Sequence, residues 1–162
     1  MLNESQIEQV WRGMLAAETR ALYFADLTRK STIKKQWLMG ASFFLASGAA
    51  AELLAKGPAW IATASASLVA VISAYTIAVN PDKNIATLTK LSTGWDRIAD
   101  EYKILWDHTY ADDAEDRLLT IMKLERECSE LAIAGVKYDP KLLGYWQNRI
   151  LQLHNIAAEQ HG

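Results

Sequence analysis

Apolar and polar residues follow two different patterns along this chain. Over residues 3–35, apolar positions recur every three to four residues, which is the period of an amphipathic α-helix. Residues 36–81 instead carry only two charged side chains, Glu52 and Lys56. After residue 81 the helical period returns, with charged residues between the apolar ones. The pattern predicts an all-α chain with an apolar middle and amphipathic helices on both sides.

The first segment predicts one long amphipathic helix. Asn3 is placed as an N-cap, and Gln6 follows three residues later, as in a capping box. Pro58 is the first proline, so this helix can continue into the apolar middle. Its expected apolar stripe consists of Ile7, Val10, Trp11, Met14, Ala17, Ala21 and Ala25.

The apolar middle divides into two runs that are long enough to be transmembrane helices. As helices, residues 37–54 would extend roughly 27 Å and residues 58–79 about 33 Å, against a hydrocarbon thickness of ~30 Å. The basic cluster before the first run places both termini in the cytoplasm and the hairpin in the inner (cytoplasmic) membrane. The alternative is a soluble bundle that buries both runs. The cluster consists of Arg29, Lys30, Lys34 and Lys35, against Lys56 alone in the loop.

Three further amphipathic helices are expected after residue 81. Asp112 is placed as the N-cap of the second, and Asp139 as that of the third, with Pro140 in its first turn. Gly135 is expected to cap the C-terminal end of the second helix. The first helix carries a seam that packs either between subunits or against the other two helices. This seam is Ile85, Leu88, Leu91, Trp95, Ile98, Tyr102 and Leu105.

The predicted organisation therefore has three parts. Residues 1–35 form an N-terminal amphipathic helix, residues 36–80 a transmembrane hairpin, and residues 81–162 a cytosolic three-helix region. Their formal charges are +2, 0 and −4, which sum to the net charge of −2. An acidic C-terminal half argues against duplex DNA binding, which needs a basic surface.

No catalytic motif is visible in the sequence, and we expect neither an enzyme nor a cofactor. The histidines His108, His154 and His161 are scattered without metal-ligand spacing and are expected at the surface or near helix ends. Cys128 is the single cysteine, so no disulfide can form within the chain, and its position suits a small buried apolar residue.

Polar residues of the second apolar run share one face of the expected helix. They fall within an arc of about 80° at 100° per residue, and in a homo-oligomer they would line a pore. The alternative is that the hydroxyl groups bond to carbonyls of their own helix. The expected pore-lining residues are Ser65, Val69, Ser73, Thr76 and Asn80. In the first run, a series of small residues allows close helix packing in the membrane: Ser42, Ala46 and Ala50.

Four basic residues around the last two helices are the candidate site for an anionic ligand. Nucleotide phosphates require local positive charge, and these residues are the nearest approach to a basic group in this region. The alternative is that they are scattered surface charges. They are Arg126, Lys137, Lys141 and Arg149.

The chain resembles the SLATT family in its layout and in its aromatic and basic positions. A helix containing RALYFADLTRK (residues 20–30) leads into a two-helix hairpin, and a long helix containing WDRIADEYKILWD (residues 95–107) follows. The resemblance covers roughly residues 8–135. SLATT proteins are two-transmembrane effector domains of prokaryotic defence systems that use nucleotide second messengers.

The resemblance implies a homo-oligomeric membrane effector in antiphage defence. Such an effector forms a regulated pore or ion channel in the lipid bilayer and depolarises the cell. Its signal would be a nucleotide or oligonucleotide made by a companion nucleotidyltransferase and sensed by the cytosolic helices. Two alternatives stay open: a soluble or peripheral helical interaction module with a buried apolar hairpin, and an unregulated, holin-like membrane lesion.

Overall fold

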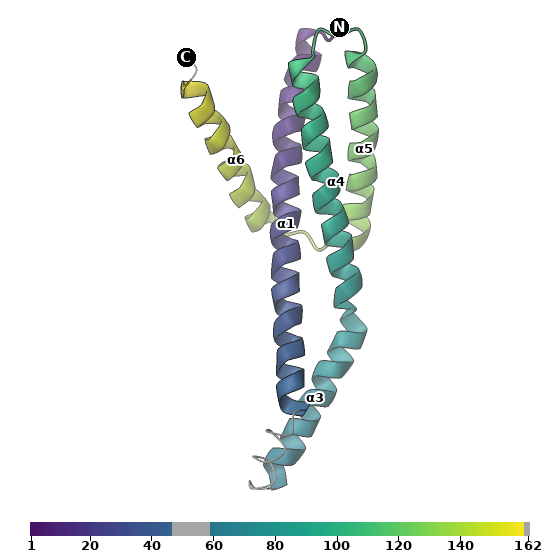
Figure 1. The fold of residues 1–162 in the computed structure, drawn as a ribbon, viewed down its shortest axis with the longest axis vertical. Coiled ribbons are helices and arrows are strands. Elements are labelled where there is room, and N and C mark those ends of the chain that lie inside the picture. The colour runs from purple at the N-terminus through teal and green to yellow at the C-terminus, as the bar shows by residue number, and fades with distance from the viewer. Residues whose placement is uncertain (47–58, 161–162) are drawn as a thin grey trace. The chain divides into compact units, whose positions relative to one another are not determined.

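The computed structural model of the protein describes residues 1–46 and 59–160, apart from some side chains within these ranges. Over these residues the chain forms five helices and no strand (Figure 1). The all-α prediction is confirmed, and the first helix does continue from the amphipathic segment into the first apolar run. The helices are α1 (Glu4–Ala46), α3 (Ala59–Val79), α4 (Pro81–Asp107), α5 (Ala114–Gly135) and α6 (Pro140–Gln160).

The helices are divided between two compact units. Unit 1 comprises Met1–Thr28 and Ala86–Gly162, and unit 2 comprises Arg29–Ile85. The first part of α1 and most of α4 belong to unit 1 together with α5 and α6. The later part of α1, α3 and the start of α4 form unit 2.

Unit 1 is a helical bundle built around the seam of α4. In Figure 1, α4 and α5 lie on one side of α1 and α6 lies on the other. Leu91 and Leu105 are fully buried, and Trp95 is only 1% exposed, against residues of α1 and α5. The seam is therefore filled by helices of the same chain, which is one of the two packings that its sequence allows.

Local signals set two helix starts as expected. The amide of Gln6 donates to Asn3 Oδ1 at 2.9 Å, and the amide of Asn3 donates to Gln6 Oε1 at 2.8 Å. This reciprocal pair confirms the capping box. At the start of α6, Asp139 Oδ1 accepts from the amides of Lys141 and Leu142, both at 3.1 Å, so the predicted N-cap is confirmed as well.

The ends of α5 differ from the prediction by one residue. The N-cap position is occupied by Asp113 rather than Asp112, and its side chain makes no capping bond. Asp113 Oδ2 instead accepts from Arg117 Nε at 2.7 Å. At the other end, Gly135 is still helical and the C-cap is Val136, whose extended backbone leads towards α6.

The stripe of α1 shifts after Ala21. Ala25 is exposed, whereas Tyr23 and Phe24 are buried, so the expected stripe is wrong at its last position. The rings of Tyr23 and Phe24 meet edge to face with centroids 5.0 Å apart, and the Tyr23 hydroxyl accepts from the Asp139 amide at 2.9 Å. Two large rings cover more of the core than alanine can, which decides this part of the packing.

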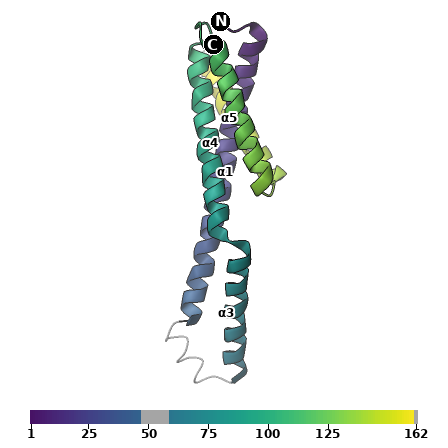
Figure 2. The same cartoon turned by 90° about the vertical axis from the view of Figure 1, so that its right-hand side faces the viewer.

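Unit 2 brings the later part of α1 beside α3 (Figure 2). Asn80 separates α3 from α4 with a φ of 42°, a left-handed conformation that asparagine tolerates better than most residues. Its amide still donates to the Thr76 carbonyl at 3.1 Å. Pro81, which lacks an amide donor, then begins α4.

Within the described parts of the chain, no helix has both the length and the apolar character that crossing a membrane requires. The first expected span, residues 37–54, extends beyond the described residues at position 47. The second, residues 58–79, is described as helix from Ala59.

Candidate functional site

The expected pore-lining residues lie on α3 and at its end. Thr76 is half-buried, and its hydroxyl donates to the Ile72 carbonyl at 2.8 Å, the arrangement named above as the alternative. Ser73 is exposed and Val69 is half-buried. Asn80 is exposed in the junction after α3, and the side chain of Ser65 lies outside the described residues. A role of this face in a pore stays a prediction.

The structure describes only part of the small-residue series of the first apolar run. Ser42 is half-buried on α1. Ala46 is the last residue of α1, and its side chain is not described, while Ala50 lies outside the described residues. Close helix packing through this series also stays a prediction.

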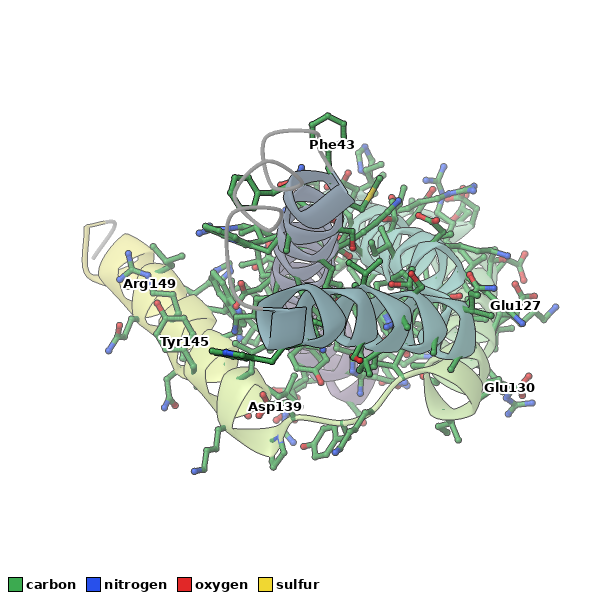
Figure 3. The ribbon with its side chains drawn as sticks, turned by 90° about the horizontal axis from the view of Figure 1, so that it is seen from below. Phe43, Glu127, Glu130, Asp139, Tyr145 and Arg149 are labelled. Atoms are coloured by element: carbon green, nitrogen blue, oxygen red, sulfur yellow. The ribbon has the colours of Figure 1, made fainter. Side chains whose placement is uncertain are left out.

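The four basic candidate ligands are all exposed and lie on different parts of unit 1. Arg126 is on α5, and Arg149 is on α6. Figures 1 and 3 place these two helices on opposite sides of α1. Lys137 is in the connection between them, and Lys141 is in the first turn of α6. The structure thus spreads these side chains over two helices and the connection between them.

The two helices of unit 2 are joined by polar contacts near the start of α4. Lys34 Nζ donates to the Tyr75 hydroxyl at 2.7 Å and lies 5.2 Å from the centroid of that ring. Lys35 forms a salt bridge with Asp82. These contacts use two members of the basic cluster that was expected at the cytoplasmic membrane surface.

Beyond these contacts, unit 2 presents large apolar side chains to its surroundings. Trp37 is 76% exposed and Phe43 79%, and Phe43 points away from the helices (Figure 3). On α3, Ile77 is 81% exposed. Exposed apolar groups of this size are costly in water. Others in this unit are Met39, Phe44, Trp60, Leu68 and Val71.

In unit 1, a polar network around the buried Tyr102 links α1, α4 and α5. The guanidinium of Arg20 lies 4.4 Å from the centroid of the Trp95 ring. Burial raises the pKa of Tyr102, and the nearby Glu125 carboxylate, to which it is hydrogen-bonded, raises it further. Burial also raises the pKa of Glu125, although the charge of Arg20 and the bond from Tyr102 act in the opposite direction.

A second polar cluster joins α6 to the rest of unit 1. Glu18 on α1 accepts from Lys103 Nζ on α4 at 2.9 Å and is bonded to His154 Nε2 on α6 at 2.8 Å. Burial would raise the pKa of Glu18, but the hydrogen bonds from His154 and Lys103 outweigh it, and the pKa is lowered. The bond to Glu18 raises the pKa of Lys103.

Sequence reasoning missed this cluster. His154 was expected at the surface or near a helix end, yet it contacts Glu18 and packs its ring edge-on against Trp11, with centroids 5.3 Å apart. The three polar residues lie far apart along the chain, so no local spacing could have paired them. The only available signal was that Glu18 falls next to the buried stripe of α1, where an acidic residue requires a partner.

Metal and thiol chemistry find no support in the described residues. Nowhere among them do three or more histidine, cysteine or acidic side chains gather in a way that could hold a metal ion. Burial raises the pKa of Cys128, and this disfavours the thiolate. Gly94 lies directly beside the sulfur, because a Cβ at this position would be 2.8 Å from Cys128 Sγ. Cys128 therefore acts as a packing residue between α4 and α5.

Comparison with protein-family models, with curated proteins and with solved structures finds no match for this chain.

Proposed function

We propose that the protein is a homo-oligomeric effector of the cytoplasmic membrane. Residues 37–54 and 58–79 would form a transmembrane hairpin, and unit 1 would lie in the cytosol. Hairpins from several copies would assemble into a regulated pore that depolarises the cell. The oligomer, the location and the channel activity are all parts of this proposal.

The apolar surface of unit 2 is the observation that carries the proposal. Trp37, Phe43 and Ile77 are each at least three-quarters exposed, and they lie on two different helices. Burying apolar surface is favourable by about 25 cal/mol per Å², and two helices alone cannot bury all sides of each other. A lipid bilayer covers such a surface without needing a matching partner for each side chain.

The proposal uses the whole apolar middle of the sequence. The finding that no helix is long and apolar enough to cross a membrane concerns only the described residues, which omit 47–58. Over α3, Ala59–Val79, the sequence contains no charged residue in 21 positions. This is the length that a transmembrane helix requires, about 20 apolar residues.

The polar face of α3 supports the pore. Ser73 is exposed, and Thr76 is half-buried one turn further on, so two hydroxyl residues lie on this side of α3. Polar groups within a bilayer are favourable only where they face protein or water. In an oligomer arranged around an axis, such a face would point towards the centre.

The biological setting rests on the resemblance to SLATT proteins. It suggests a role in antiphage defence and a nucleotide-derived signal that acts on the cytosolic helices. Unit 1 suits this role because it joins α1 and α4, which both continue into unit 2, to α5 and α6.

Cell fractionation and membrane-potential measurements test the proposal together. The full chain is expressed in bacteria, membranes are washed with alkaline carbonate, and a potential-sensitive dye is read in the same cultures. We expect the protein in the carbonate-resistant membrane fraction and depolarisation when the signal-producing partner is present. Recovery in the soluble fraction with an unchanged potential would refute the membrane effector. Equal depolarisation with and without the partner would indicate an unregulated lesion.

A further inference from the structure

A shallow apolar groove runs along the later part of α1. Its volume is about 480 Å³. Gly40 leaves the gap in its floor, since a Cβ built at this position has no atom within 4 Å. The groove is flanked by Trp37 and Phe44, which are 76% and 60% exposed. Its lining residues are Gln36, Trp37, Gly40, Ala41 and Phe44.

Basic side chains lie on α1 directly before this groove. Arg29, Lys30 and Lys34 are all exposed. Asp82 is the only acidic residue of unit 2 within the described part of the chain, and it pairs with Lys35. The Lys34 ammonium contacts the neutral Tyr75 hydroxyl, so its charge is not cancelled. Arg29 and Lys34 therefore give this end of unit 2 an excess of positive charge.

The basic residues and the groove share one face of the helix. Lys30, Lys34, Trp37, Ala41 and Phe44 follow one another at spacings of three or four residues, which keeps side chains on one side of an α-helix. Lys34 and Phe44 are ten positions apart, or roughly 15 Å along the helix axis. A phosphate near Lys34 would therefore leave an acyl chain room to run along the groove.

We propose that this face of α1 binds an anionic phospholipid. The basic residues hold the phosphate of the headgroup, Trp37 lies at the level of the glycerol, and one acyl chain packs over Gly40 against Phe44. Charge complementarity and the continuity of the basic surface with an apolar groove favour a lipid over an acidic protein, which would leave the groove empty. The site rests on the proposed membrane hairpin and would fix its depth at the cytoplasmic leaflet.

Thermal unfolding of the purified full chain in a mild non-ionic detergent tests the site. Phosphatidylglycerol, phosphatidylcholine and glycerol phosphate are titrated separately. We expect phosphatidylglycerol to raise the melting temperature in a saturable way, with little effect of the other two. An equal rise with phosphatidylcholine would overturn the headgroup recognition, and an equal rise with glycerol phosphate would show a soluble-anion site instead of a lipid site.

Two variants test the headgroup contact and the acyl-chain contact separately. Arg29→Gln with Lys30→Gln should weaken the apparent affinity for phosphatidylglycerol roughly 30-fold, because each basic residue near an anionic surface contributes about 1 kcal/mol. Gly40→Leu fills the groove and should also weaken binding while leaving both charges in place. Matched controls in unit 1 are Arg97→Gln with Lys123→Gln, both exposed, and Gly144→Leu, whose Cβ also meets no atom within 4 Å. Unchanged binding in both test variants would refute the site.

Carbonate extraction of the same variants distinguishes a failure of the lipid site from a failure of the proposed transmembrane hairpin. A carbonate-resistant protein without a selective response to phosphatidylglycerol would remove the lipid site and leave the hairpin standing. A protein released by carbonate that still binds phosphatidylglycerol through Arg29 and Lys30 would remove the transmembrane hairpin and leave a peripheral lipid site.

Discussion

The carboxylate of Glu18 on α1 lies 2.8 Å from Nε2 of His154 on α6. The other carboxylate oxygen accepts from Lys103 on α4 at 2.9 Å. One acidic side chain, only 15% exposed, thus connects three helices of unit 1. Ile150 on α6 is buried as well. The contacts of Glu18 and Ile150 together attach the last helix to the bundle.

The lowered pKa of Glu18 predicts a loss of stability in acid. Its bonds to His154 and Lys103 stabilise the fold fully above the ordinary carboxyl pKa of 4.5, and this contribution is lost as the pH falls through the lowered pKa of the folded state. At pH 7 we expect Glu18→Gln to lower the free energy of unfolding by only about 1 kcal/mol, because Lys103 is half exposed.

Melting temperatures between pH 3 and pH 7 check this prediction. The difference between wild type and Glu18→Gln should start to shrink below pH 4.5 and disappear once the pH has fallen through the lowered pKa of the folded carboxyl group. Glu130→Gln, on the outer side of α5 (Figure 3), is the matched control and should leave the acid profile unchanged. A constant difference over the whole range would contradict the assigned ion-pair role.

Gly13 is required by the close approach of Tyr102. A Cβ at Gly13 would lie 2.4 Å from Cζ of the buried Tyr102 ring. Gly13→Ala should therefore destabilise the protein by about 1–2 kcal/mol, despite the better helix propensity of alanine. Gly144→Ala on α6 meets no such contact and should instead stabilise by up to about 1 kcal/mol. Chemical denaturation of both variants would show the opposite signs.

Glu125 carries a cost in its charged form. Its raised pKa means that ionisation is less favourable in the fold than in water, so stability from its neutral form is present below pH 4.5 and is lost as the pH rises through the raised value. Glu125→Gln keeps an acceptor for Tyr102 without the charge and should raise the melting temperature at pH 7. Glu125→Ala leaves the buried hydroxyl without this acceptor and should cost about 1–3 kcal/mol. A lower melting temperature for Glu125→Gln would show that Arg20 needs the charge.

Removing a hydroxyl group and adding bulk near the end of α3 should affect ion flux differently. Thr76→Val removes a hydroxyl that already bonds to the Ile72 carbonyl, so flux through the proposed pore should change less than about twofold. Ser73→Leu with Thr76→Leu should narrow the pore and abolish most of the flux in reconstituted liposomes. Ala78→Leu, on the opposite face of α3, is the control of equal bulk. If the double leucine variant conducts like the wild type, this face does not line a pore.

Local features of the fold could be predicted from the sequence because their partners are close along the chain. Asn3 and Gln6 form their capping box within one turn, and Asp139 caps the helix that begins at the next residue. The apolar seam of α4 was visible from its period alone. These features depend on short-range geometry that the residue order itself specifies.

Only the tertiary structure decided which surfaces meet. The period of the α4 seam allowed partners within or between chains, and the burial of Trp95 and Leu105 shows that the chain fills the seam itself. Glu18, Lys103 and His154 come together from three helices, although nothing in their spacing relates them. On α1, Phe24 is buried instead of the expected Ala25 because of the contacts that the Tyr23 and Phe24 rings make. Helix formation is a local property of the sequence, whereas the choice of partner depends on side-chain volumes and charges that meet only once distant helices pack together.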